Sequence, residues 1–193
     1  MVRAAKLSKR FGEKRVLDRV DVAVESGELL LVTGPNGSGK TTLLRVLAGL
    51  DAPTAGTVDL PDRAAIGYLG HEPLVYRELT PLENLHLFGR LYRIPARAER
   101  TGMLLERFGL WDVRDHRVST FSRGMRQRLG LCRVLLHEPS LVLLDEPFNA
   151  LDEGGAALLD ATLEELTTRS AVVVATHDPV RLERLATSRL AFA

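Results

Sequence analysis

The first 32 residues alternate short apolar stretches with polar turns. Apolar runs at residues 2–7, 16–17 and 20–24 are separated by charged residues, and a Glu-Ser-Gly-Glu turn at 25–28 precedes another apolar run at 29–32. Short apolar segments bounded by turn residues are typical of β-strands that pair with their neighbours in the chain. We therefore predict a mostly antiparallel β layer at the N-terminal side of the protein.

The pattern becomes helical in the middle of the chain. Two further short strands are predicted at residues 57–60 and 65–69, and helical spacing of apolar residues begins at Thr80. Thr80 and Glu83 have the spacing of a capping box, with Pro81 at the first helical position. Residues from about 80 to 120 are therefore predicted to form a mainly helical subdomain. Within and after it, helical spacing covers residues 80–91, 96–108 and about 124–136.

Two continuous apolar runs follow, at residues 141–144 and 171–175, with a helical pattern at 156–166 between them. Uninterrupted runs of this length are typical of parallel strands that are buried on both faces. Strands that alternate with helices predict an α/β fold in which helices flank a mainly parallel sheet. Since 193 residues correspond to one domain of ordinary size, residues 1–193 are predicted to form a single domain.

The composition adds few constraints. The formal net charge is +1, which gives no general attraction to nucleic acid or to an anionic membrane. Cys132 is the only cysteine, so no internal disulfide can form, which is compatible with a reducing cytosol. Its place in an apolar helical run predicts a buried thiol. No apolar run approaches the ~20 residues that cross a bilayer, and we expect no signal peptide. If the protein serves a membrane process, we expect another chain to cross the membrane.

A glycine-rich segment at 34–41, Gly-Pro-Asn-Gly-Ser-Gly-Lys-Thr, lies between the apolar run 29–32 and a helical pattern. Such a loop turns its backbone N–H groups toward phosphate oxygens, and the following helix adds the positive end of its dipole. Lys40 is predicted to bind the β- and γ-phosphates, and the Thr41 hydroxyl to ligate Mg²⁺. The residues predicted to bind nucleotide here are Gly34, Pro35, Asn36, Gly37, Ser38, Gly39, Lys40, Thr41 and Thr42.

Polar residues directly follow both buried strands, where ligands of parallel sheets bind. Asp145 is predicted to hold Mg²⁺ through water, and Glu146 to polarise the water that attacks the γ-phosphate, an acidic turn being the alternative. His177 is predicted to sense the γ-phosphate, so that Lys40, Glu146 and His177 are the predicted catalytic residues. Phe11 is predicted to stack on the adenine, the alternative being an ordinary core position.

The segment Phe-Ser-Arg-Gly-Met at 121–125 completes a set of motifs that resembles the ATP-binding cassette (ABC) ATPase family over essentially the whole chain. It resembles the family's Leu-Ser-Gly-Gly-Gln signature, with Ser122 and Gly124 retained and three positions changed. The other matches are residues 34–41 with the Walker A motif, 141–146 with Walker B, 149–152 with the D-loop and His177 with the switch histidine.

This resemblance implies a cofactor set and a partner. ATP and Mg²⁺ are the expected cofactors. In this family the signature contacts the γ-phosphate that the facing subunit holds, so Ser122 and Gly124 are expected to bind the ATP of a partner. A head-to-tail dimer that closes over two ATP molecules follows, and we expect it to be a homodimer.

The family usually places a glutamine near Mg²⁺ and the attacking water, within a segment that corresponds to residues 68–73. Counting back from Thr80 puts His71 at that position, so His71 is a predicted metal ligand, with Glu72 as the alternative. Residues 74–91 correspond to the family's contact surface for an integral membrane transporter subunit. The resemblance therefore implies an ATPase that powers a separate membrane subunit and lies peripherally on the cytoplasmic face of the cell membrane.

Three features narrow the resemblance to the ATP-binding subunits of haem exporters in cytochrome c maturation, and haem export is therefore expected. They are the short chain after His177, the Gly-His-Glu-Pro segment at 70–73 and the segment 145–152. Other small ABC exporters share most of them. The sequence leaves open the transported substrate, the direction of transport, the membrane partner and whether the dimer contains two identical chains.

Two other classes of protein remain alternatives. A soluble ABC ATPase acting on nucleic acid or ribosomes usually carries long insertions or two fused cassettes, and the arginines between residues 90 and 133 are interleaved with acidic residues, so we expect no nucleic-acid partner. A P-loop kinase would need neither the segment 122–124 nor His177.

Overall fold

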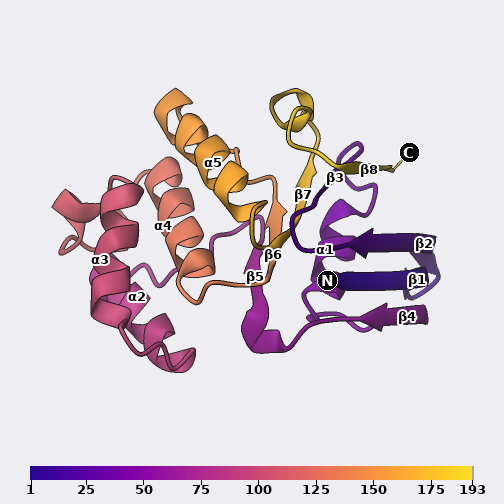
Figure 1. Ribbon diagram of the computed structural model, residues 1–193, viewed down its shortest axis with the longest axis horizontal. Coiled ribbons are helices and arrows are strands. Elements are labelled where there is room, and N and C mark those ends of the chain that lie inside the picture. Colours follow the sequence, from indigo (N-terminus) through magenta and orange to yellow (C-terminus); the bar gives the residue numbers. More distant parts are fainter. Residues whose placement is uncertain (193) are drawn as a thin grey trace.

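A five-stranded parallel sheet lies at the centre of the protein (Figure 1). The computed structural model describes residues 1–192. The strand order is β5-β6-β7-β3-β8, and every neighbouring pair is parallel. The strands are β3 (Leu29–Thr33), β5 (Ile66–Leu69), β6 (Leu141–Asp145), β7 (Ala171–Thr176) and β8 (Ser188–Ala191). The predicted α/β fold with a mainly parallel sheet is confirmed.

Alternate residues of the central strands are buried in two different hydrophobic cores. Leu29 and Leu31 of β3 belong to one core, and Leu30 and Val32 to the other. Successive side chains of a strand point to opposite faces of the sheet, so a strand covered on both faces needs apolar residues at every position. This explains the unbroken apolar runs that identified these strands. The helices that cover the sheet are α1 (Lys40–Leu47), α4 (Arg123–Leu135) and α5 (Glu153–Leu166).

The second sheet is antiparallel and lies at the end of the molecule opposite to the helices α2, α3 and α4 (Figure 1). Its strands are β2 (Lys14–Val24), β1 (Val2–Phe11) and β4 (Ala55–Asp59), in that order. The predicted antiparallel layer is thus confirmed, with two corrections. Residues 14–24 form one strand instead of two, because the pairing with β1 shifts register near Arg19 and the strand continues through its polar residues. The third strand, β4, comes from beyond the phosphate-binding segment.

The helical subdomain predicted between residues 80 and 120 is present. Thr80 and Glu83 form the predicted capping box, in which the Thr80 hydroxyl accepts from the Glu83 N–H at 3.2 Å and the Glu83 carboxylate accepts from the Thr80 N–H at 2.8 Å. The subdomain contains α2 (Pro81–Leu91), α3 (Arg97–Arg107) and the short 3₁₀ turns η2 (Trp111–Val113) and η3 (Val118–Thr120). Helix α4 contacts both α2 and α3 and also β5, the edge strand of the parallel sheet, so it joins the helical subdomain to the sheet.

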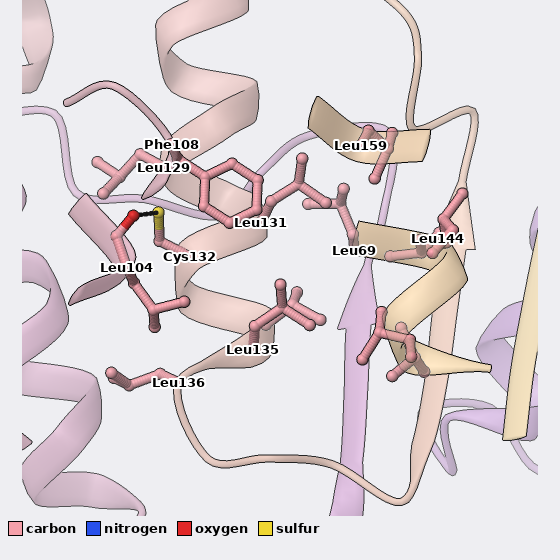
Figure 2. Close-up of a cluster of buried hydrophobic side chains, with 14 of the residues drawn as sticks. Leu69, Leu104, Phe108, Leu129, Leu131, Cys132, Leu135, Leu136, Leu144 and Leu159 are labelled. Atoms are coloured by element: carbon pink, nitrogen blue, oxygen red, sulfur yellow. Dashed lines mark hydrogen bonds between the residues drawn. The ribbon is translucent and has the colours of Figure 1, made fainter. Parts of the chain in front are cut away.

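Leucine side chains from α3, α4 and the parallel sheet pack into one continuous core (Figure 2). Cys132 lies within it, where its thiol donates to the backbone carbonyl of Leu104 at 3.5 Å, and burial raises the pKa of this thiol. The predicted buried cysteine is confirmed, and its raised pKa excludes a reactive thiolate at neutral pH.

The sequence pattern does not indicate β8. Among the described residues this strand pairs only with β3, at the edge of the sheet, and most of its residues are exposed, so it lacks a continuous apolar run. Helix α5 also begins three residues earlier than expected, because the Asp152 carboxylate caps the N–H of Gly155 at 2.8 Å. Within residues 1–192, no helix has the length and apolar character that a bilayer crossing requires.

Candidate functional site

The carboxyl ends of β3, β6 and β7 meet at one edge of the parallel sheet and border a cavity of about 540 Å³. Neighbouring parallel strands end at the same edge, so the polar residues that follow them converge there. Most of the predicted site residues line this cavity. They are Phe11, Asn36, Gly37, Gly39, Lys40, Thr41, Thr42, His71, Asp145, Glu146 and His177.

The glycine-rich loop joins β3 to α1 and has a backbone that requires glycine. Gly34 has φ 146°, and a Cβ there would lie 2.7 Å from the carbonyl oxygen of Phe192. Gly39, the N-cap of α1, has φ 112°, and a Cβ there would lie 3.0 Å from the carbonyl oxygen of Val16. No acidic residue occupies the first turn of α1, and no side chain caps it. The N–H groups at this helix start can therefore bind an anion such as phosphate.

Lys40 is the first residue of α1 and is buried beside the loop. Its ammonium group donates to the backbone carbonyls of Gly34 and Pro35, at 2.7 Å and 3.1 Å. It also lies 3.7 Å from the Oε1 atom of Glu146. The positive charge of Lys40 therefore lies between the glycine-rich loop and the carboxylate that follows β6. A phosphate bound by the loop would contact the ammonium group there.

Thr41 and Asp145 form a pair of oxygen ligands. The Thr41 hydroxyl donates to Oδ2 of Asp145 at 2.6 Å. Burial raises the pKa of Asp145, the hydrogen bond from Thr41 opposes this, and the nearby negative charge of Glu146 raises the pKa further. A cation beside this carboxylate would relieve both unfavourable effects. Oxygen ligands of this kind suit Mg²⁺. Residues 1–192 contain no cluster of three or more His, Cys, Asp or Glu side chains arranged to hold a metal ion, so phosphate oxygens and water would have to complete the coordination.

Glu146 is held in an unusual conformation by the end of β7. Its backbone has φ 48°, in the left-handed region, and its N–H donates to the carbonyl of Ala175 at 2.8 Å. Its Oε2 atom accepts from the Thr176 hydroxyl at 3.0 Å and lies 3.0 Å from Nδ1 of His177. Its Oε1 atom is buried and has no hydrogen-bond partner within the described chain. A strained residue with one unpartnered buried oxygen in a cavity is a functional-site feature.

Phe11 and His71 lie at the border of the same cavity. Phe11 ends β1, its ring is half exposed, and the Lys9 ammonium lies 5.0 Å from the ring centroid. An exposed aromatic face beside a phosphate-binding loop can stack on a base. His71 is exposed and also lines an adjoining cavity of about 410 Å³ together with Glu72. The structure therefore leaves both His71 and Glu72 available for the role of the family's glutamine.

Ser122 and Gly124 do not line the cavity of about 540 Å³ in their own chain, which we call the nucleotide cavity. They border a separate hollow of about 350 Å³ with Asp152. Ser122 caps α4, its hydroxyl accepting from the N–H of Met125 at 3.2 Å. A Cβ on Gly124 would lie 2.6 Å from the carbonyl oxygen of Ala150, so the segment after β6 packs directly on the start of α4. This separation is what a site shared between two chains requires, and the role of both residues stays a prediction.

Comparison with known proteins identifies the family. A family model described as "ABC transporter" matches residues 17–149, which is more than half of the chain. This chain belongs to the ABC transporter ATPase family. Two solved structures support the assignment. The cassette is similar to an ATP-binding subunit of an ABC transporter, with a TM-score of 0.93 and 27% identity over 100% of this chain and 85% of that one. It is also similar to the dimeric ATP-binding cassette MJ0796 in a post-hydrolysis state bound to ADP and Pi, with a TM-score of 0.89 and 29% identity over 100% and 94% of the two chains.

Curated relatives of this ABC ATPase carry different names. An uncharacterized ABC transporter ATP-binding protein, YxlF of Bacillus subtilis, is 39% identical over 92% of this chain and 62% of its own length. The daunorubicin resistance ATP-binding protein DrrA3 of Streptomyces coeruleorubidus is 43% identical over 77% of this chain and 51% of its own. The cytochrome c biogenesis ATP-binding export protein CcmA of Pseudomonas syringae is 42% identical over 84% of this chain and 81% of its own. The chain thus spans about half to three fifths of the length of the first two of these relatives.

Four residues in or beside the cavity were not among the predicted site residues, although Asn149 was named as part of the D-loop. Lys14 and Val16 line the cavity from β2, and Asn149 lines it from the segment after β6. Thr176 contacts Glu146 without lining the cavity. Lys14 follows Phe11 across a tight hairpin, and Thr176 directly precedes His177, so proximity to a predicted site residue was the available signal in both cases.

Proposed function

We propose that this chain binds Mg·ATP and hydrolyses it as the ATP-binding subunit of an ABC transporter. The observation that carries this proposal is the convergence of Lys40, the pair Thr41 and Asp145, and Glu146 on one cavity at three strand ends. Family membership and the similarity to a solved cassette with bound ADP and Pi support the same reaction.

Each group of the cavity has a definite task in this proposal. Backbone N–H groups of the loop 34–39 and the Lys40 ammonium bind the phosphates, and Phe11 stacks on the base. Thr41 and Asp145 hold Mg²⁺, which when bound neutralises phosphate charge, and His71 is proposed as a further ligand. These groups fix the γ-phosphate in front of Glu146.

Hydrolysis requires one water and one base. Glu146 accepts a proton from the attacking water, whose oxygen forms a bond to the γ-phosphorus while the bond from that phosphorus to the bridging oxygen breaks. The electron pair of the broken bond leaves with ADP, and Lys40 stabilises the negative charge that develops. His177 donates a hydrogen bond to the γ-phosphate, and its 3.0 Å contact with Glu146 in this structure places it beside the site.

The proposed working unit is a homodimer with a membrane partner. Ser122 and Gly124 of one chain complete the nucleotide site of the other, and closure of the dimer drives an integral membrane subunit that contacts residues 74–91. Leu74 and Tyr76 of this segment are more than half exposed, which supports a contact surface there. The chain would then lie peripherally on the cytoplasmic face of the membrane, where ATP is available. Nucleic acid has no part in this proposal.

The variant Glu146→Gln tests the catalytic role and the dimer together. It removes the base and keeps the shape of the side chain, so hydrolysis should fall by at least about a hundredfold while ATP still binds. With Mg·ATP present, light scattering should then show a dimer that accumulates in the variant and not in the wild type. Glu106→Gln, the same change at an exposed position of α3 away from the cavity, is the matched control and should behave as wild type.

Two results would contradict the proposal. A Glu146→Gln protein that hydrolyses ATP at the wild-type rate would exclude Glu146 as the base. A wild-type protein that hydrolyses no ATP, either alone or with its membrane subunit co-purified, would exclude the ATPase function itself.

The narrower proposal is haem export for cytochrome c biogenesis. It rests on the identity with CcmA, which extends over 81% of that protein, and on the segment 70–73. Deletion of the gene should abolish c-type cytochromes with covalently bound haem in the host, as detected by haem staining. The wild-type gene should restore these cytochromes, and a gene that encodes the Lys40→Ala variant should not. Normal c-type cytochromes after deletion would exclude haem export and leave the ATPase proposal intact.

A further inference from the structure

Only one oxygen of the Glu146 carboxylate, Oε2, has hydrogen-bond partners among the described residues. The Thr176 hydroxyl and the His177 ring both reach Oε2, each at 3.0 Å, whereas Oε1 has no hydrogen-bond partner in residues 1–192. The nearest cation to Oε1 is the Lys40 ammonium, at 3.7 Å. The two oxygens of this carboxylate are therefore not equivalent. One is anchored to β7, and the other is buried beside the Lys40 ammonium at the start of α1.

The Thr176 hydroxyl has one proton, and its surroundings direct that proton to Glu146. The N–H of Asp178 donates to the Thr176 oxygen at 3.1 Å, which uses one of its lone pairs. Two acceptors remain within reach, Oε2 of Glu146 at 3.0 Å and the carbonyl of Asp178 at 3.3 Å. The carboxylate is closer and charged, so it takes the proton.

The two contacts to Oε2 differ in rigidity. The His177 side chain is 54% exposed and lies in a loop beyond the strand. Thr176 is 4% exposed and is the last residue of β7, where it pairs with Thr33 of β3. The backbone N–H of Glu146 is bonded to Ala175 in the same strand. Thr176 is therefore the fixed anchor of the carboxylate, and His177 is the contact that can leave to meet a γ-phosphate.

We propose that Thr176 is a positioning residue for hydrolysis: its hydroxyl fixes Oε2 of Glu146, so that Oε1 is the oxygen that accepts the proton of the attacking water. This inference rests on the proposed ATPase function. It assigns to Thr176 no contact with nucleotide, because Thr176 does not line the cavity that Glu146 lines.

Thr176→Val tests the proposal, because it keeps the shape of the side chain and removes the hydroxyl. Loss of a hydrogen bond to a charged group should lower kcat by about tenfold to a hundredfold if the bond orients the base. KM and Kd for ATP should stay within about twofold, because Thr176 does not line the nucleotide cavity. Thr176→Ser retains the hydroxyl and should restore at least half of the wild-type kcat.

A matched control separates positioning from folding. Thr162 of α5 is 2% exposed and does not line the cavity; its hydroxyl donates to the carbonyl of Leu158 and accepts from Arg107 at 3.2 Å. Thr162→Val removes an equally buried hydroxyl and should leave kcat unchanged. Should Thr176→Val be insoluble, Thr176→Ala provides the same comparison. In the Glu146→Gln background, Thr176→Val should lower residual hydrolysis by less than about twofold, since the base that it orients is already absent.

The outcomes distinguish this inference from the function on which it rests. If the wild type hydrolyses ATP and Glu146→Gln does not, but Thr176→Val keeps the wild-type kcat, the positioning role is wrong and the ATPase proposal stands. An equal loss of kcat in Thr176→Val and Thr176→Ser would also overturn the positioning role, because the loss would then not depend on the hydroxyl. If the wild type hydrolyses no ATP, the ATPase proposal itself fails.

Discussion

Gly124 and Gly154 occupy the same position in two helices, and only one of them has room for a side chain. Each is the second helical residue after a capping residue, Ser122 for α4 and Asp152 for α5. A Cβ on Gly154 meets nothing closer than 4.0 Å, whereas a Cβ on Gly124 would lie 2.6 Å from the backbone carbonyl of Ala150. Replacement of each by alanine therefore compares the same helical position with and without the contact between α4 and the segment after β6.

The expected magnitudes follow from these distances. In Gly124→Ala, the carbonyl must retreat by about 0.8 Å to reach the 3.4 Å of ordinary contact, and overpacking of this kind costs about 1–3 kcal/mol. The helix gains up to about 1 kcal/mol from alanine, so the net loss is about 0–3 kcal/mol. Gly154→Ala should gain the same helix stability without an overpacking cost, because its Cβ has no close contact. For a chain of this size the melting temperatures of the two variants should differ by roughly 2–10 °C, with Gly154→Ala the higher.

The functional readouts should separate in the same way. Gly124 does not line the nucleotide cavity of its own chain, so binding of ATP to the monomer should be normal in both variants. Hydrolysis, and the dimer trapped by Glu146→Gln, should fall only with Gly124→Ala, because the start of α4 and the adjacent segment 149–152 would move at the proposed interface. If Gly124→Ala melts as high as Gly154→Ala and hydrolyses ATP normally, the close contact with Ala150 does not constrain this helix.

Two other expectations concern stability. Because burial raises the pKa of Asp145, the folded chain holds that proton more tightly than the unfolded chain, so without Mg²⁺ and nucleotide its contribution to stability is full below pH 3.8 and is lost as pH rises through the raised pKa. Asp145→Asn lacks this loss of stability, so urea unfolding in EDTA should show the free energy of unfolding of the variant rising relative to that of the wild type from pH 4 to 7. Hydrolysis by the variant should be abolished. A difference in the free energy of unfolding that stays constant over this pH range would contradict the burial effect. Phe108→Ala removes a ring that is 1% exposed and should cost about 3–5 kcal/mol in urea unfolding, whereas Leu91→Ala, 66% exposed, should cost less than about 0.5 kcal/mol; similar costs for both would refute the assignment of the helical core.

Local patterns predicted those parts of the fold in which one physical effect dominates. Unbroken apolar runs identified β6 and β7 because both faces of the sheet are covered, and the capping box at Thr80 fixed the start of α2 because it needs only residues three apart. The strand, loop and helix around residues 34–41 followed for the same reason, since phosphate binding by backbone N–H groups requires a short and specific sequence.

Features that depend on distant parts of the chain were not predictable in this way. The third strand of the antiparallel sheet, β4, follows the phosphate loop by more than ten residues and joins a layer that precedes the loop. Strand β8 is an edge strand that pairs with β3. The left-handed backbone of Glu146 is also set by a contact with another strand, because it depends on the bond from its N–H to Ala175.

The pairing between β6 and β7 connects the hydrophobic core to the proposed chemistry. In the observed register Asp145 lies opposite Ala175, which brings the next residue along each strand, Glu146 and Thr176, into contact at 3.0 Å. A slip of one residue would turn every side chain of β7 to the other face and place Ala175 or His177 where the Thr176 hydroxyl now lies. Since the apolar residues of both strands hold this register, the packing of the two cores also determines which oxygen of Glu146 is free. The geometry of the proposed base therefore depends on the core as directly as the stability of the fold does.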